Sequence, residues 1–209
     1  MAQKALSRSF QCEQVTPGSL TGSSVVVTRR GFVASGASTL PMLTRLGSAH
    51  AKVPAGFKTA VDTQDGYQFA YPNGWQATSF AGYDAAFTDV VEALEGVTLA
   101  VASTSRSSVT ELGSPEDACR KLLDTQIESS NQSAKLLKAS ERIDSNTKQP
   151  IYDFEFAVAA PSYLRHCLGC FAIANGRQYT LAAGSDERRF RKAFKQLKTV
   201  RDSFTLTPA

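Results

Sequence analysis

The clearest pattern along the chain is a series of short runs in which apolar and polar residues alternate. In residues 151–158, Tyr152, Phe154, Phe156 and Val158 fall on one face, and acids occupy the other. A period of two predicts a strand with one buried face. The same reasoning predicts strands at 67–71, 85–89, 97–101, 136–143, 164–173, 178–183 and 204–206.

Two segments have the spacing of amphipathic helices instead. The first begins at Ser114-Pro115, because Ser114 suits the N-cap and Pro115 suits the first helical position. Its apolar stripe is Cys119, Leu122, Leu123 and Ile127. The second helix begins at Gly184-Ser185-Asp186, and its expected buried stripe is Phe190, Phe194, Leu197 and Val200.

The order of these elements predicts the fold class. Asn175-Gly176, between two predicted strands, is a strong signal for a tight hairpin turn. Hairpin-linked strands with two helices predict an α+β fold, in which an antiparallel β-sheet is sandwiched by helices. We expect one such domain over residues 65–209, preceded by a short extended arm at 52–64.

Residues 1–51 differ from the rest, and we interpret them as a targeting leader. Residues 1–28 are rich in Ser, Thr and Gln and contain a single acid, which is typical of organellar transit peptides. A twin-arginine export signal is indicated by the features that follow. These are the pair Arg29-Arg30, a short apolar stretch, and small residues at Ala49 and Ala51. Together they form a bipartite leader, which predicts delivery to the chloroplast thylakoid lumen. A bacterial periplasmic signal and an arginine-containing tail without a targeting role are the alternatives.

The net charge of +4 lies wholly in this leader. Residues 1–51 carry five basic side chains and one acidic, which leaves 18 of each sign in residues 52–209. Acids concentrate between Asp62 and Glu128, whereas the last helix is basic. Its candidate docking residues are Arg188, Arg189, Arg191, Lys192, Lys195 and Lys198.

A basic helix face has two interpretations. It can be an ordinary solvated surface, or it can dock on an acidic surface of a membrane complex. The sequence contains no nucleic-acid-binding motif and no basic–aromatic groove pattern, so nucleic acid is not an expected partner.

The cysteines raise the possibility of redox chemistry. Cys167 and Cys170 form a CxxC pair, but the flanking residues predict a strand, in which positions i and i+3 point to opposite faces. Two structural thiols are therefore the first interpretation. A redox role, including a disulfide with Cys119, is the alternative.

His166 is the one histidine outside the leader, and it suits either an ordinary strand histidine or a weak metal ligand beside a carboxylate. The sequence has no phosphate-binding loop, dinucleotide-binding glycines, EF-hand loop or G-x-S-x-G nucleophile. We therefore predict no enzymatic activity, no small-molecule substrate and a monomer.

A set of short motifs occurs in a fixed order from residue 65 onward. They are Asp65-Gly66-Tyr67, Tyr71-Pro72-Asn73-Gly74-Trp75, Phe87-Thr88-Asp89, Glu111-Leu112-Gly113-Ser114-Pro115-Glu116, Arg165-His166, Asn175-Gly176-Arg177 and Glu187-Arg188-Arg189-Phe190. With these motifs, residues 53–207 resemble the PsbP family, the extrinsic thylakoid-lumen proteins associated with photosystem II. The short arm before Asp65 makes the chain more similar to the PsbP-like members than to the oxygen-evolving-complex subunit itself.

The resemblance implies a function and a candidate site. It implies a lumenal accessory protein that contacts photosystem II lumenal subunits and assists assembly, repair or stability of the oxygen-evolving complex. Relatives that serve photosystem I or the thylakoid dehydrogenase complex provide the alternative. The resemblance also implies weak binding of calcium or another divalent metal at His166 and Glu187.

Overall fold

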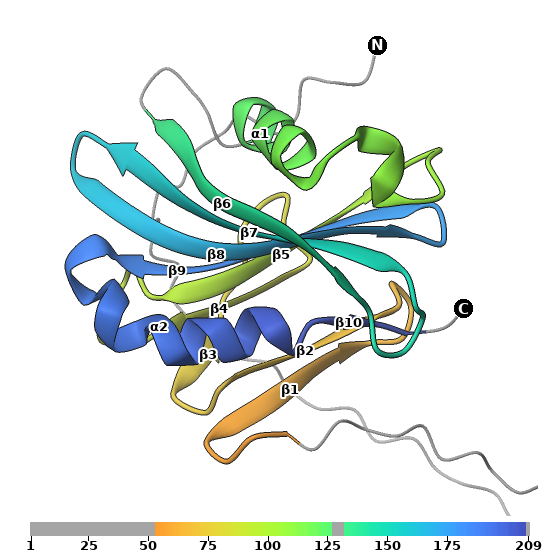
Figure 1. Cartoon of the computed structure of the whole chain (residues 1–209). Coiled ribbons are helices and arrows are strands. Elements are labelled where there is room, and N and C mark those ends of the chain that lie inside the picture. The colour runs from red at the N-terminus through yellow and green to blue at the C-terminus, as the bar shows by residue number, and fades with distance from the viewer. Residues whose placement is uncertain (1–52, 127–131, 208–209) are drawn as a thin grey trace, which may run out of the picture. The chain divides into compact units, whose positions relative to one another are not determined.

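The computed structural model describes residues 53–126 and 132–207, whose strands form two sheets (Figure 1). The larger sheet has the order β3-β4-β5-β9-β8-β7-β6 and the smaller one β1-β2-β10, with every neighbouring pair antiparallel. The strands are β1 (Phe57–Asp62), β2 (Tyr67–Pro72), β3 (Trp75–Ala77), β4 (Ala85–Asp89), β5 (Gly96–Ser103), β6 (Ser133–Ile143), β7 (Pro150–Ala160), β8 (Tyr163–Ala174), β9 (Arg177–Asp186) and β10 (Thr205–Leu206). The helices are the 3-10 turn η1 (Val109–Leu112), α1 (Pro115–Gln126) and α2 (Glu187–Asp202).

Three long strands, β9, β8 and β7, lie side by side in the large sheet, between β5 and β6. The turn between β8 and β9 is Asn175-Gly176, and both residues have positive φ, 53° and 70°. This is the conformation that a two-residue hairpin turn requires, because its twist matches that of the strands. The hairpin predicted from the sequence is therefore present.

Helix α1 covers one face of the large sheet. The Ser114 hydroxyl accepts a hydrogen bond from the backbone N–H of Asp117 at 3.2 Å, as expected of an N-cap. Cys119, Leu122 and Leu123 pack in one apolar cluster with side chains of β7 and β8, including Phe154. The end predicted for this helix, at 129–131, lies outside the described residues.

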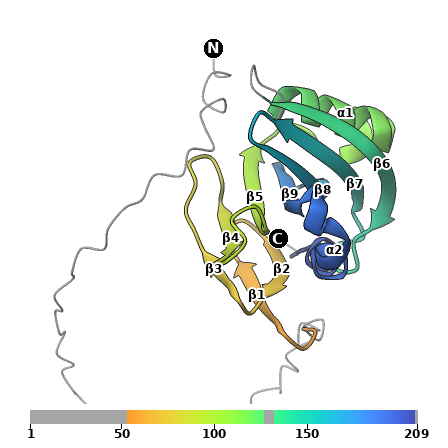
Figure 2. The same ribbon diagram turned by 90° about the vertical axis from the view of Figure 1, so that its left-hand side faces the viewer.

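Helix α2 and the small sheet cover the opposite face (Figures 1 and 2). Phe190, Leu197 and Val200 pack with Phe69 and Leu181 in a second apolar cluster. Phe194, which the sequence pattern places in the same buried stripe, is 40% exposed, and Ala193 is buried instead. That expectation was wrong because α2 packs mainly on β8, β9 and β2, which leaves the side that faces β6 uncovered.

The predicted α+β fold, an antiparallel sheet between helices, is confirmed. Residues 184–186 were expected to begin the second helix, but they end strand β9 because all three pair with β8. The Asp186 carboxylate then caps α2 by accepting a hydrogen bond from the N–H of Arg188 at 2.9 Å. The expected extended arm at 52–64 contains β1, which pairs with β2, and the short strand β3 was not predicted. Within the described residues, no helix has the length and apolar character needed to cross a membrane.

Candidate docking surface and histidine cluster

His166 lies on β8 and contacts side chains from two other elements. Its Nε2 atom is 2.8 Å from Oε1 of Glu155 on β7, and its Nδ1 atom is 2.9 Å from Oε2 of Glu187, the first residue of α2. The ring stacks on Phe190 with centroids 3.5 Å apart and planes 4° apart. The cluster thus joins the sheet to the start of α2.

This arrangement satisfies both nitrogens of the ring with carboxylate oxygens. Two such hydrogen bonds can be donated together only by an imidazolium, because neutral imidazole has one N–H. The structure brings His166 and Glu187 together, as the resemblance implied, and adds Glu155, which was not predicted. Its position on the polar face of the 151–158 alternation was the available signal, but the pairing of β7 with β8 decided the contact.

The histidine cluster fits calcium poorly. Calcium takes six to eight oxygen ligands. This cluster offers only the two ring nitrogens of His166 and one carboxylate group hydrogen-bonded to each of them. A metal ion at His166 would have to displace one of these hydrogen bonds. Metal binding at His166 and Glu187 therefore stays a prediction.

A separate group of carboxylates converges where β1, β2 and the segment before β4 meet. Oxygen atoms of Asp62, Asp65 and Asp84 lie within 4.8 Å of one another, and no other group of three such ligands occurs in 53–126 and 132–207. Burial is the main cause of the raised pKa of Asp65, and the two neighbouring carboxylates raise it further. Each acid also has a partner within the chain: Asp62 accepts from the N–H of Gln64, Asp65 pairs with Arg177 at 3.0 Å, and Asp84 accepts from the Tyr67 hydroxyl.

The six predicted docking residues of α2 divide into two groups. Two have partners within the chain, because Arg189 lies 2.9 Å from Glu92 and Lys198 pairs with Asp202. The other four side chains are exposed and form no ion pair with any described residue: Arg188, Arg191, Lys192 and Lys195. We call these four residues the free basic face of α2.

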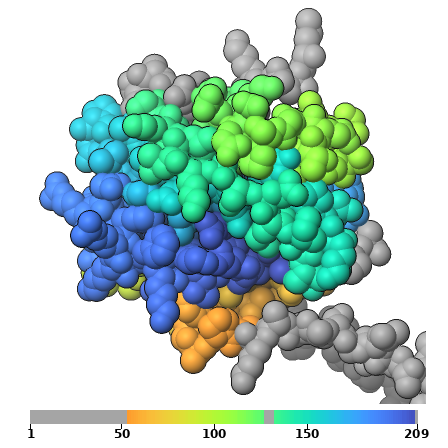
Figure 3. Space-filling view, viewed as in Figure 1, coloured from red at the N-terminus to blue at the C-terminus, as the bar shows by residue number. Residues whose placement is uncertain are grey.

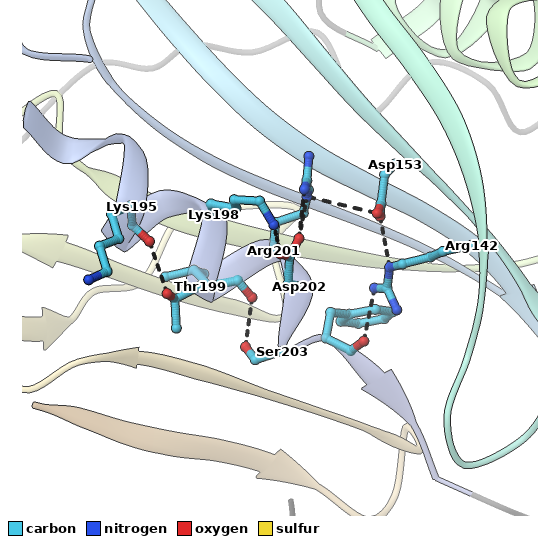
Figure 4. A network of polar contacts seen from close by, with 10 residues as sticks. Arg142, Asp153, Lys195, Lys198, Thr199, Arg201, Asp202 and Ser203 are labelled. Carbon is cyan, nitrogen blue, oxygen red and sulfur yellow. Dashed lines mark hydrogen bonds and ion pairs between the residues drawn. The ribbon is translucent and has the colours of Figure 1, made fainter. Parts of the chain in front are cut away.

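The C-terminal end of α2 is held by a buried ionic network (Figure 4). Nε of Arg142, on β6, lies 3.0 Å from Oδ1 of Asp153 on β7, and its Nη2 donates to the carbonyl oxygen of Phe204 at 3.0 Å. Arg201 approaches the same carboxylate at 3.9 Å. Burial raises the pKa of Asp153, and the two guanidinium groups only partly oppose that shift.

The thiols lie in apolar surroundings. Cys167 packs in the cluster under α1 and Cys170 in the cluster under α2, so the CxxC sulfurs are on opposite faces of the sheet. Cys119 shares the α1 cluster with Cys167, and all three are free and buried. Burial raises the pKa of the Cys119 thiol to about 12 and also raises the pKa of the other two. Since the thiolate is the reactive species, these surroundings oppose redox chemistry.

Comparison with known proteins gives the class to which this fold belongs. The sequence profile of the PsbP family matches residues 55–206. The solution structure of cyanobacterial PsbP (CyanoP) from Synechocystis matches with a TM-score of 0.62 and 27% identity, over 77% of this chain and 98% of that one. The chain therefore belongs to the PsbP family.

Several curated proteins are also similar in sequence to this chain. PsbP-like protein 1 of Arabidopsis thaliana is 40% identical over 73% of this chain, and the photosynthetic NDH subunit of lumenal location 1 of the same plant is 32% identical over 74%. CyanoP of Thermosynechococcus vestitus is 36% identical over 73% of this chain and 87% of its own length. The chain spans 65% and 64% of the two Arabidopsis proteins. Their names describe chloroplastic proteins, one of them lumenal, in agreement with the localisation expected from the leader.

Proposed function

We propose that this protein is a non-enzymatic accessory protein of the thylakoid lumen that docks on photosystem II through the free basic face of α2. The role in assembly, repair or stability of the oxygen-evolving complex is part of this proposal. Family membership and the similarity to CyanoP support it.

The observation that carries the docking proposal is the division of the α2 cations. Arg189 and Lys198 are neutralised within the chain, whereas the free basic face projects four unpaired charges from one helix. A patch of one sign attracts an oppositely charged surface and accelerates association in a salt-dependent manner. An acidic lumenal surface of a photosystem II subunit is the matching partner.

The chemistry of the described side chains supports a non-catalytic role. His166 is held by two glutamates and covered by Phe190, so its proton-transfer atoms already have partners. The three cysteines are buried with raised pKa values, which disfavours a thiolate nucleophile.

The second candidate partner is the thylakoid NAD(P)H dehydrogenase-like complex. A relative named as a lumenal subunit of the photosynthetic NDH complex is 32% identical, which is the specific observation in favour of this alternative. The same docking face serves either partner, because an acidic surface is the property that it recognises.

Co-migration on native gels, combined with salt washes of thylakoids, tests the proposal. The perturbation is the triple variant R188E/K192E/K195E, which reverses three charges of the free basic face. The matched control, K58E/R120E/K121E, reverses three exposed charges on β1 and α1. We expect the first variant to lose binding to photosystem II by roughly tenfold or more at low salt, and the control to bind like the native protein.

The possible results separate the candidates. Co-migration with photosystem II supports the proposal, and co-migration with the dehydrogenase complex favours the second candidate. Recovery of the native protein free of both complexes at low salt contradicts both.

A further inference from the structure

The turn between β4 and β5 carries two neighbouring valines, Val90 and Val91, which we call the valine pair. Val90 is 62% exposed and Val91 is 81% exposed, and no other large apolar side chain in the described part of the chain is as exposed as either of them. Side chains this exposed contribute little to the core. They gain free energy only when another molecule covers them, because burial removes their apolar surface from water.

The backbone on both sides of the valine pair is fixed by hydrogen bonds. Oδ1 of Asp89 accepts from the N–H of Val91 at 2.8 Å and from the N–H of Glu92 at 3.0 Å. The N–H of Asp89 donates to the carbonyl oxygen of Glu95 at 2.9 Å, and the N–H of Glu95 donates to that of Glu92 at 2.7 Å. A contact that is ordered before binding loses less conformational entropy when it forms.

The same turn is joined to α2 by ionic and polar contacts. The guanidinium of Arg189 lies 2.9 Å from Glu92 and 3.6 Å from Glu95, and Gln196 donates to Glu95 at 3.5 Å. Lys192 of the free basic face comes three residues after Arg189 and four before Gln196, so it shares this side of the helix. Figure 3 shows α2, in blue, at the surface of the molecule. The valine pair therefore lies in a turn beside the free basic face.

The charges around the valine pair are of both signs. Lys192 lies on the helix side, whereas Asp89, directly before Val90, forms no ion pair with any residue in 53–126 and 132–207. An anionic lipid surface would attract the lysine and repel the aspartate, and the apolar side chains that enter lipid interfaces are typically Trp, Phe and Leu. A protein surface can match each charge separately, so the mixed pattern favours a protein.

We infer that the valine pair is the apolar part of the docking surface and is covered by a protein surface that places an apolar patch beside acidic residues. The inference deepens the proposed function and rests on it, because the acidic residues are those that the free basic face recognises. Charge attracts the partner over a distance and makes binding sensitive to salt. The valine pair adds a short-range contact, of the kind that forms the apolar centre of an interface.

The first test separates the apolar contribution to binding from the ionic one. The dissociation constant of V90S/V91S for salt-washed photosystem II membranes is measured at several salt concentrations. The matched control is V53S/V61S, because Val53 and Val61 are also exposed, at 40% and 49%, and lie before and on β1. We expect V90S/V91S to bind roughly tenfold more weakly at every salt concentration, with an unchanged salt dependence, and the control to bind like the native protein.

Native-like binding by V90S/V91S, or an equal loss with V53S/V61S, overturns the inference and leaves the proposed function intact, because the charge-reversal variant tests that function separately. If the native protein itself fails to bind these membranes at low salt, the inference and the proposed function fail together. Circular dichroism of each variant verifies that its fold is retained, and the exposure of all four side chains makes the substitutions compatible with folding.

The second test identifies what covers the valine pair. Val91 is replaced by the photo-crosslinking residue p-benzoylphenylalanine, and the bound protein is irradiated on the same membranes, with Val61 replaced in the control. The expected result is a cross-link from position 91, and none from position 61, to a protein surface where apolar and acidic residues adjoin. A cross-link to lipid or to a second copy of this chain overturns the inference, as does the absence of any cross-link from position 91 of the bound protein.

Discussion

Replacement of Arg142 by Met should remove the main partner of a buried carboxylate. The Asp153 side chain is 9% exposed, and Nε of Arg142 lies 3.0 Å from it, whereas Arg201 is 3.9 Å away (Figure 4). Removing one partner of a buried ion pair costs about 3–5 kcal/mol, because the other charge stays desolvated. The substitution also removes a hydrogen bond to the carbonyl oxygen of Phe204. We expect the free energy of unfolding to fall by about 3–5 kcal/mol at neutral pH.

The loss should depend on pH with a definite sign. Burial raises the folded-state pKa of Asp153 above its unfolded value, so the folded protein binds the proton more tightly. The contribution of Asp153 to the free energy of unfolding therefore declines as the pH rises from the unfolded-state pKa of this carboxyl group through its folded-state pKa. Without Arg142 the folded pKa rises further, so this decline extends to higher pH. The difference between native protein and R142M should be largest at neutral pH and should shrink on acidification.

Urea unfolding at several pH values measures both quantities. Trp75 is the one tryptophan of the chain and is 3% exposed, so its fluorescence reports unfolding. K138M is the matched control, because Lys138 is an exposed cation on the same strand, and it should change stability by no more than about 0.5 kcal/mol. In the double variant R142M/D153L the unpaired charge is gone, so much of the stability should return. A loss below about 1 kcal/mol, or one independent of pH, would refute the reasoning.

Two further predictions concern the packed sheet. G169A should lower the free energy of unfolding by about 1–3 kcal/mol, measured by the same urea titration. The reason is that the added Cβ would lie 2.6 Å from Cζ of Phe154 and 2.9 Å from the Leu181 carbonyl oxygen. G74A is the control, because a Cβ there meets nothing within 4 Å, and equal losses in the two variants would contradict the packing argument. In the chain without the leader, the three buried thiols should react with maleimide only after unfolding, because burial raises the pKa of each. Mass spectrometry of the same protein under oxidising conditions should find no intramolecular disulfide. Rapid labelling of the folded protein, or a disulfide from Cys119 to Cys167, would revive the redox alternative.

The sequence predicted the local elements well, and for physical reasons. The alternation in 151–158 corresponds to β7, Asn175-Gly176 to the β8–β9 turn, and Ser114 to the N-cap of α1. Each signal depends on neighbours within a few residues, so it is readable without the tertiary structure. The separation of Cys167 from Cys170 follows in the same way, because strand geometry alone sends them to opposite faces.

The candidate site was predicted only in part. The helical period placed Phe194 in the buried stripe. A period identifies which side of a helix is apolar, but it does not tell how much of that side the rest of the protein covers. The prediction of six docking residues treated all the cations of the last helix alike. It could not distinguish Arg189, which pairs with Glu92 from the β4–β5 segment, from the unpaired Lys192. Glu155 was likewise visible as a polar strand residue without any sign that it meets His166.

The sequence by itself determined most of the elements, their order, the antiparallel α+β class and the place of the charges along the chain. Only the tertiary structure decided which charges are neutralised, which aromatic side chain stays exposed, and that His166 lies between Glu155 and Glu187. Local propensities act over a few residues, whereas these contacts join strands and helices distant in sequence. Their geometry depends on how β6, β7, β8 and α2 pack together, which no short-range pattern encodes.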